Sequence, residues 1–439
     1  MVEKFIEEFT KAAHERGIRN LEFYAESVQS ASVNIYEKQP EFQTESDVEA
    51  CYVEGEYQGY KGYIYAEDFS EKYLEEKLDQ FCEIAEYLKE PYEAKELGNC
   101  TCQKEFELSG VEHMTEQLLQ TVEACEGIHP DFNKFSHLSA RETIRRIVIQ
   151  NDRGGRMEDA VKFAGVYVGA EAVKNDAVQT SGGEDVKGSA GELKMEAVAR
   201  EAIEEACSLL GASPVETKKY PVILKNSVIC EMLSMYLPSF GADTVRKNIS
   251  KLAGQAGKEV ASEIVNLVED PEGLNARSFD DEGTPTIKKY LIRDGILGEY
   301  LYNQAEALLA GKSSTGNGFK SSYRSVPAIG VTNLKLIGEE KSREMLIEEL
   351  QDGLYITACD GMFAGADPVS GDFSLISKGY LVKNGKLDRA VNQIAVAGNF
   401  YDMLKNIRGI ANDYLVTGGA GGIFEAPSVS VGELVVSGK

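Results

Sequence analysis

The stretch Lys219-Tyr220-Pro221-Val222-Ile223-Leu224 is the feature from which the fold of this chain can be predicted. Its short apolar run is typical of a buried strand. After it, segments with helical and strand periodicity alternate to the end of the chain. We predict helices at residues 227–236, 288–310, 342–350 and 401–407, and strands at 263–268, 329–337, 354–358, 373–382, 392–397 and 428–436. Short strands in this mixed order favour an α+β fold over a regular doubly wound sheet.

The region before residue 216 has a different pattern. We predict helices at residues 5–13, 70–89, 114–126 and 192–210, strands at 21–26, 32–36, 50–54, 62–65, 141–151 and 161–169, and a mobile, glycine-rich connection at 180–191. The acidic stretch 92–110 has no clear period and marks a boundary. We therefore expect an N-terminal α/β domain (1–110), a middle domain (111–215) and a larger, strand-rich C-terminal domain (216–439).

The balance of charge disfavours some classes of partner. The 439 residues include 72 Asp and Glu but only 46 Lys and Arg, which gives a formal charge of −26. Nucleic acids and anionic membranes are bound mainly through Lys and Arg, so we expect no direct binding to either.

The first residues, MVEKFIEEFTKAA, carry charges where a signal peptide has its apolar core, so we expect neither a signal nor a transit peptide. No stretch approaches the run of about 18 apolar residues that a spanning helix needs. The eight cysteines contain no CxxC pair, which favours a reducing compartment. These features predict a cytoplasmic protein.

The four histidines limit the chemistry of the C-terminal part. They are His14, His113, His129 and His137, so no histidine follows residue 137. An HExxH zinc motif is therefore absent from that part. A Ser or Cys nucleophile there would need a base from the N-terminal third.

Several short motifs have a structural interpretation. Gly311-Lys312-Ser313 resembles the tail of a phosphate loop, but Glu306 stands where that loop needs a glycine, so we interpret Gly311 as a helix C-cap. The cluster Gly418–Gly422 is predicted to lie in a loop that needs positive φ or close backbone approach. The acidic group 279–283 is interpreted as a solvated turn with Asx-type hydrogen bonds rather than a cation site. Cys359 is interpreted as a small hydrophobic residue rather than a nucleophile.

Further strings in the last half of the chain, together with the 219–224 stretch, resemble the TldD/PmbA family. They are Ser278-Phe-Asp-Asp-Glu-Gly-Thr-Pro285, Ser314-Thr-Gly-Asn-Gly318, Val331-Thr-Asn-Leu334, Gly371-Asp-Phe-Ser374, Val396-Ala-Gly-Asn399 and the terminal 426–438. Before residue 140 the resemblance is weak, although Asn151-Asp-Arg-Gly154 also fits. The resemblance implies a PmbA/TldD-like α+β fold.

In that family the TldD branch looks like a zinc peptidase with an HExxxH motif on the helix after the 219–224 strand and a late cysteine ligand. Here the two histidine positions are occupied by Cys230 and Met235, while Glu231 remains, and Ala420 falls about where the cysteine would be. The resemblance therefore implies a member of the PmbA (TldE) branch that lacks catalytic zinc, so no cofactor is expected and zinc would be held by a TldD-like partner.

That branch is implied to act as the partner subunit in a heterodimeric peptidase for unfolded or small precursor peptides, and the family is also labelled a modulator of DNA gyrase. A homodimer is the other assembly considered. We expect an extended peptide to lie in a channel lined by small and polar residues, because these let another backbone approach. The candidates are Ser314, Thr315, Gly316, Asn317, Asn333, Asp372, Ser374, Gly398 and Asn399.

Two alternatives remain open from the sequence. In the first, the chain is an autonomous hydrolase with Cys359 or Cys230 as nucleophile or with carboxylates that hold another metal. Alternatively, it is a scaffold or gyrase-associated protein without a role in proteolysis.

Overall fold

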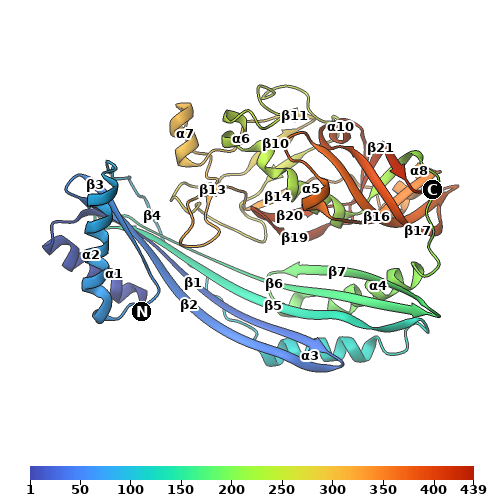
Figure 1. Ribbon diagram of the computed structural model, residues 1–439, viewed down its shortest axis with the longest axis horizontal. Helices are drawn as coiled ribbons and strands as arrows, with labels where there is room; N and C mark the ends of the chain where they lie inside the picture. The colour runs from blue at the N-terminus through green and yellow to red at the C-terminus, as the bar shows by residue number, and fades with distance from the viewer.

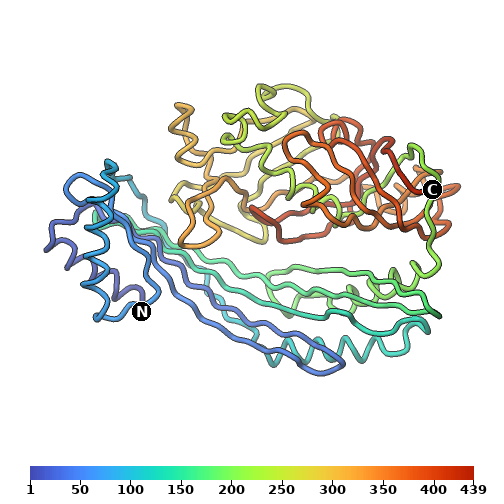
Figure 2. The backbone as a smooth tube through the Cα atoms, in the orientation of Figure 1, coloured from blue at the N-terminus to red at the C-terminus, as the bar shows by residue number.

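The computed structural model describes residues 1–439, and it contains two bodies that lie side by side (Figure 1). We refer to residues 1–208 as the N-terminal body and to residues 218–439 as the C-terminal body. The chain passes from one to the other once, after helix α4, as the tube in Figure 2 shows. The α+β fold class predicted from the sequence is confirmed. None of the helices has the length and apolar composition needed to span a lipid bilayer.

The N-terminal body is built on a seven-stranded sheet with the order β3-β2-β1-β5-β6-β4, in which β7 also pairs with β6. Its strands are β1 (Arg19–Tyr36), β2 (Gln39–Tyr57), β3 (Tyr60–Ala66), β4 (Asn99–Cys100), β5 (Phe132–Asn151), β6 (Arg156–Lys174) and β7 (Ala177–Lys187). Its helices are α1 (Val2–Glu15), α2 (Glu71–Leu88), α3 (Val111–Ala124), the short η1 (Ala190–Glu192) and α4 (Met195–Ser208).

Two helix pairs cover opposite ends of this sheet (Figure 1). Helices α1 and α2 bury Phe5, Phe9 and Phe81 against β1–β3. Helices α3 and α4 bury Met114 and Ile203 against β1, β5 and β6. One continuous sheet thus runs through residues predicted to form two domains, and the division at residue 110 stays a prediction.

The long strands correct two predictions. Residues 21–26 and 32–36 belong to one strand, β1, because the polar residues between them alternate between the two faces without interrupting the pairing to β2 and β5. Residues 180–191 were predicted to be a mobile connection, but most of them form β7. Its Gly182 and Gly183 pair in register with Gly169 and Val168 of β6.

The C-terminal body contains two six-stranded sheets, with the orders β17-β16-β15-β8-β21-β18 and β11-β10-β9-β14-β20-β19. Its first strands are β8 (Lys218–Leu224), β9 (Leu267–Glu269), β10 (Lys289–Arg293), β11 (Ile296–Leu297), β12 (Gly318–Phe319), β13 (Ala328–Ile329) and β14 (Asn333–Leu336). The later ones are β15 (Gly353–Asp360), β16 (Asp372–Lys383), β17 (Lys386–Asn399), β18 (Ile407–Ile410), β19 (Leu415–Gly419), β20 (Gly422–Ala426) and β21 (Val429–Ser437).

The helices of this body are α5 (Asn226–Tyr236), η2 (Leu237–Phe240), α6 (Ala242–Arg246), α7 (Gln304–Ala310), α8 (Arg343–Leu350), α9 (Met362–Gly365) and α10 (Phe400–Lys405). The predicted helix 288–310 is wrong over most of its length. Asp294 and Gly295, with φ of 48° and 76°, close a turn between β10 and β11, and only α7 is helical. Gly311, with φ of 63°, caps α7 as predicted.

The stretch predicted to be a buried strand is β8, in the middle of its sheet. Val222, Ile223 and Leu224 are each 0% exposed. Pro221 is tolerated because it lies opposite a bulge of β21, where the register shifts between Val431 and Glu433. Strand β8 therefore fixes the start of α5 within the core of the C-terminal body.

Candidate functional site

A cavity of about 460 Å³ lies between the two bodies, and we refer to it as the central cavity. Strands β5, β6 and β7 and helix α4 line it from the N-terminal body, and α5, β15 and β16 line it from the C-terminal body. In Figure 1, β7 is the strand of the long sheet that faces the C-terminal body.

Helix α5 brings Glu231 to this cavity because of its helical period. Val228, Ile229, Met232 and Leu233 face the core and are buried, whereas Glu231 lies on the other side of the helix and lines the cavity. Lys225, which precedes the helix, holds its orientation relative to the N-terminal body through an ion pair of 2.7 Å between its Nζ and Oε1 of Glu201 on α4.

Three carboxylates line the central cavity and form no ion pair: Glu184, Glu231 and Asp360. Burial, together with the negative charges of Glu184 and Asp360, raises the pKa of Glu231 to about 7. Burial also raises the pKa of Glu184. The carboxyl groups of Glu184 and Asp360 thus disfavour the negative charge of Glu231, and a positively charged ligand group beside them would relieve this repulsion.

Other polar side chains of the cavity form hydrogen bonds within the protein. Lys378 donates a hydrogen bond of 2.9 Å from Nζ to the carbonyl oxygen of Thr180 on β7. His137, on β5, has its Nε2 2.8 Å from Oγ of Ser139. Sequence reasoning missed Glu184, Asp360, His137 and Lys378, because they come from four strands and no local spacing connects them.

The positions that the resemblance implies for metal ligands, Cys230, Met235 and Ala420, lie where α5 meets the β19–β20 hairpin. The Cys230 thiol, 1% exposed, donates to the carbonyl oxygens of Leu415 at 3.6 Å and Phe424 at 3.8 Å. Burial raises its pKa, so the thiol keeps its proton. Met235 is half-buried against the core, and Ala420, at the hairpin tip, has no ligand atom.

The residues present therefore do not fit a zinc ion at this place. Zinc binds the thiolate form of cysteine, whereas the thiol of Cys230 is protonated and donates to two carbonyl oxygens, so it is not a zinc ligand. No group of three or more His, Cys, Asp or Glu elsewhere in residues 1–439 has an arrangement that could hold a metal ion.

Cys359 shares the central cavity with His137, but the two side chains are not paired. Its Sγ lies 3.4 Å from Oγ of Ser377, and burial raises the pKa of the thiol to about 12. A nucleophilic cysteine needs the opposite shift. This geometry supports the interpretation of Cys359 as a small buried residue.

The acidic group 279–283 is a buried turn, so the prediction of a solvated turn is wrong. Asp280 is 0% exposed. Its Oδ1 accepts hydrogen bonds from the backbone N–H of Glu282 at 3.0 Å and Thr284 at 2.9 Å, and its Oδ2 accepts one from Gly318 at 2.8 Å. The Asx-type hydrogen bonds are as predicted, and the carboxylate joins the turn to β12.

None of the nine predicted channel residues lines the central cavity. One group holds the local backbone: Ser314 and Thr315 each donate to the carbonyl oxygen of Tyr302, the Asn317 amide donates to Glu269, and the Asn333 amide donates to the carbonyl oxygen of Asp270. Gly316, with φ of 72°, lies against Pro285.

The other group lies where β16 begins and β17 ends. Nδ2 of Asn399 donates to Oδ1 of Asp372 at 2.7 Å, and Gly398 packs on Phe373. Asp372 and Ser374 are exposed. The role of both groups in peptide contact stays a prediction.

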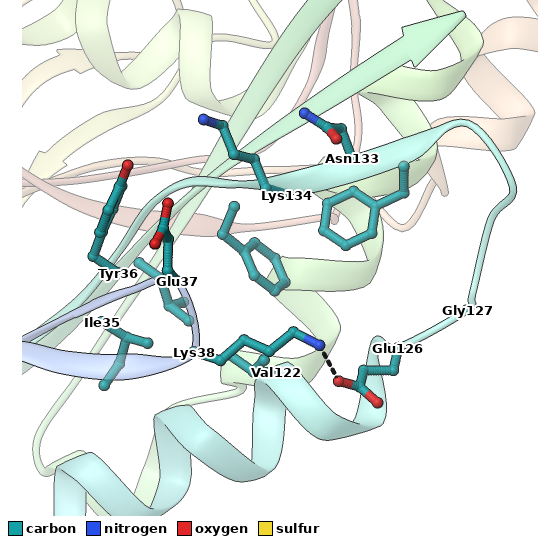
Figure 3. Close-up of a pocket in the computed structure, with 12 residues that line it drawn as sticks. Ile35, Tyr36, Glu37, Lys38, Val122, Glu126, Gly127, Asn133 and Lys134 are labelled. Atoms are coloured by element: carbon teal, nitrogen blue, oxygen red, sulfur yellow. Dashed lines mark hydrogen bonds and ion pairs between the residues drawn. The ribbon is translucent and has the colours of Figure 1, made fainter.

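A further cavity, of about 610 Å³, lies at the distal end of the long sheet (Figure 3). It is lined by the β1–β2 turn, the end of α3 and the start of β5, and an ion pair between Lys38 and Glu126 crosses it. It contains none of the carboxylates or family positions described above.

Comparison with known proteins connects the C-terminal body to a described family. Residues 217–438 match the family model described as the PmbA/TldA metallopeptidase C-terminal domain. The metalloprotease PmbA of Escherichia coli O157:H7 is 30% identical over 209 residues, which cover 47% of this chain and 44% of that protein. A metalloprotease TldD homolog of Buchnera aphidicola is 29% identical over 238 residues, which cover 53% of this chain and 49% of that protein. The matched region thus spans about half the length of these curated relatives.

Two solved structures resemble the whole chain. A protein of Thermotoga maritima, named as a candidate modulator of a DNA gyrase, has a TM-score of 0.86 and 26% identity, with 100% of each chain covered. TldE of Thermococcus kodakarensis has a TM-score of 0.88 and 18% identity, with 99% of this chain and 100% of that chain covered. At 18% identity the second likeness concerns the fold alone.

Proposed function

Because the chain belongs to the TldD/PmbA family, we propose that it is a non-catalytic, PmbA-like subunit of a TldD-type metallopeptidase and holds extended peptides in the central cavity. The observation that carries this proposal is the replacement of the metal-ligand positions. Cys230 donates to two carbonyl groups, and Met235 and Ala420 supply no zinc ligand. Catalytic zinc would then be held by a TldD-like partner.

The edge strand β7 supports strand addition as the way of binding. Strand β7 pairs only with β6, so its other edge carries no strand, and its residues 180–184 line the central cavity. Gly182 and Gly183 have no side chains that would shield their backbone groups from a second strand. Hydrogen bonds along a free edge hold an extended peptide with little sequence preference.

The unpaired carboxylates Glu184, Glu231 and Asp360 give this binding a direction. A peptide that lies along β7 with its N-terminus toward them would place its ammonium group among these three carboxyl groups and so favour their charged forms. We therefore expect peptides with a free N-terminus to bind more tightly than acetylated ones. The proposed compartment is the reducing cytoplasm, in keeping with eight free cysteines.

The test compares this chain, a TldD-like protein from the same source, and the co-expressed pair. Zinc content and cleavage of an unstructured peptide are measured for each. We expect the isolated chain to hold well under one zinc ion per molecule and to cleave nothing, and the pair to cleave the peptide. Stoichiometric zinc and cleavage by the isolated chain would instead support an autonomous hydrolase, and failure of the two proteins to associate would support a scaffold role.

Peptide binding to the chain itself is measured by fluorescence anisotropy. The double variant E231Q/D360N should weaken binding of a free-N-terminus peptide about tenfold and leave an acetylated peptide unaffected. Glu204 is exposed on α4 and outside the cavity, so E204Q is the matched control and should change neither. Equal affinity of the two peptides for the unmodified chain would contradict the proposed direction of binding.

A further inference from the structure

A second, smaller cavity between the two bodies has unusual polar groups. Its volume is about 140 Å³, and we refer to it as the hinge pocket. Strands β1, β2 and β3 line it from the N-terminal body, and the loop 320–327 closes it from the C-terminal body. The hydroxyl of Tyr65 holds this loop by donating a hydrogen bond of 3.2 Å to the carbonyl oxygen of Arg324. The hinge pocket shares no residue with the central cavity.

Lys320 presents an ammonium group that forms no direct ion pair with a carboxylate of the protein. Its Nζ lies 4.3 Å from the ring centroid of Tyr24 and 4.4 Å from that of Tyr52, so it is held between two aromatic faces. The ammonium forms neither an ion pair nor a hydrogen bond, although the backbone N–H of Lys320 donates to Oδ2 of Asp281 at 2.8 Å. Burial lowers its pKa.

Glu22 presents the complementary group. Its Oε2 is buried and has no hydrogen-bond partner, and its Oε1 is 3.9 Å from Nζ of Lys95. The neighbouring Glu54 is satisfied by Nζ of Lys61 at 2.7 Å and by the hydroxyl of Tyr52 at 2.8 Å. Buried polar atoms without partners are rare in folded proteins, and each one needs a specific explanation.

We propose that the hinge pocket binds a free α-amino acid, with its carboxylate on the ammonium of Lys320 and its ammonium on the carboxylate of Glu22. One end of such a zwitterion would pair with the ammonium of Lys320 and the other would donate to the unpartnered Oε2 of Glu22, and both would be charge-assisted hydrogen bonds. The aromatic faces of Tyr24 and Tyr52 remain beside the cation. This site is independent of the proposed peptide-binding function.

Simpler occupants fit the same groups less well. A single inorganic anion would neutralise Lys320 but would leave Oε2 of Glu22 without a donor. A water molecule needs only about 10–15 Å³, far less than this cavity, and it neutralises neither charge. The interior of a peptide has neither an ammonium nor a carboxylate on its backbone.

The lining residues come from both bodies, so a bound amino acid would join them. Glu22 belongs to β1, and Lys320 belongs to the loop 320–327 of the C-terminal body. Binding should therefore reduce the mobility of that loop. This gives a readout by hydrogen exchange that does not depend on catalysis.

The experiment titrates the full chain with glycine, L-alanine, L-aspartate and L-lysine by isothermal titration calorimetry. At least one of them should bind, and its N-acetylated and carboxamide derivatives should each bind at least tenfold more weakly, since each loses one charge. Hydrogen exchange in residues 320–327 should slow with the amino acid and stay unchanged with both derivatives.

The variants K320M and E22Q should each weaken binding at least tenfold. Lys72 lies over the ring of Tyr73 on exposed α2, and Glu76 is exposed on the same helix, so K72M and E76Q are matched controls that should bind normally. Where K320M or E22Q fails to fold, the two derivatives still decide the question on the unmodified chain. No binding of any of the four amino acids, or equal binding of inorganic phosphate, would overturn the proposal.

Discussion

The ammonium of Lys378 on β16 donates a hydrogen bond of 2.9 Å to the carbonyl oxygen of Thr180 on β7, and so links the two bodies at the central cavity. We expect K378M to lower the free energy of unfolding by about 1 kcal/mol, because the contact is charge-assisted but exposed. Amide hydrogen exchange along β7 should become faster.

The control for this contact is K383M. Lys383 lies at the end of the same strand and pairs with Asp388 at 3.2 Å, away from β7. Its replacement should leave hydrogen exchange in β7 unchanged. Faster exchange in both variants, or in neither, would contradict the linking role of Lys378.

Glu231 makes the stability of the fold dependent on pH. Burial and the nearby Glu184 and Asp360 raise its pKa from the ordinary 4.5 to about 7. Between these values the folded chain holds a proton that the unfolded chain has released, so stability falls as the pH rises through this window. E231Q removes the effect.

We therefore expect the stability of E231Q relative to the unmodified chain to increase from pH 4 to pH 8 by about 1 kcal/mol, a value reduced for the exposure of the carboxyl group. Urea unfolding at pH 4, 6 and 8 measures this difference, with E204Q as control. A difference that does not change with pH would show that Glu231 titrates normally.

The two cysteines considered as nucleophiles should be slow to react. With a pKa of about 12, Cys359 is thiolate in only about one molecule in 10⁴ at pH 8, compared with about a quarter for an ordinary thiol. Cys230 is buried and its pKa is also raised. In the folded chain we expect iodoacetamide to modify the half-buried Cys82, Cys100 and Cys102 before the five buried cysteines.

Mass spectrometry after timed alkylation identifies the modified cysteines, and alkylation in urea is the control in which all eight should react. Fast modification of Cys359 in the folded chain would mean that its thiol is activated. Such a result would support the alternative hypothesis that the chain is an autonomous hydrolase with a cysteine nucleophile.

The parts of the fold that the sequence predicts are those with a local signal. Helices α1, α2 and α5 follow from apolar period, and β8 follows from its apolar run. Strand β7 could not be predicted, because Gly182 and Gly183 have a low preference for strands and are held there by pairing with β6. The register with β6 is a long-range property.

Among the residues of the candidate site, too, only some have a local signal in the sequence. Glu231 could be found because it stands in the family's motif, whereas Glu184 and Asp360 reach the cavity from β7 and the end of β15. Only the packing of the two bodies brings these strands together. The proximity of the Lys320 ammonium to the unpartnered Oε2 of Glu22 likewise arises only because loop 320–327 packs against the N-terminal body.

The buried turn around Asp280 should be among the most sensitive points of the C-terminal body. Its carboxylate accepts hydrogen bonds from three backbone N–H groups, those of Glu282, Thr284 and Gly318. D280A leaves these donors without an acceptor in a buried place and should lower the free energy of unfolding by at least about 3 kcal/mol. D280N keeps only one acceptor oxygen. That oxygen can accept either from Glu282 and Thr284 or from Gly318, and the amide N–H₂ group then faces the remaining donors, so we expect the free energy of unfolding to fall by about 2 kcal/mol.

Urea unfolding measures the stability of both variants, with E272Q on the exposed Glu272 as control. Losses below about 1 kcal/mol for D280A would mean that water replaces the carboxylate and that the turn is solvated after all.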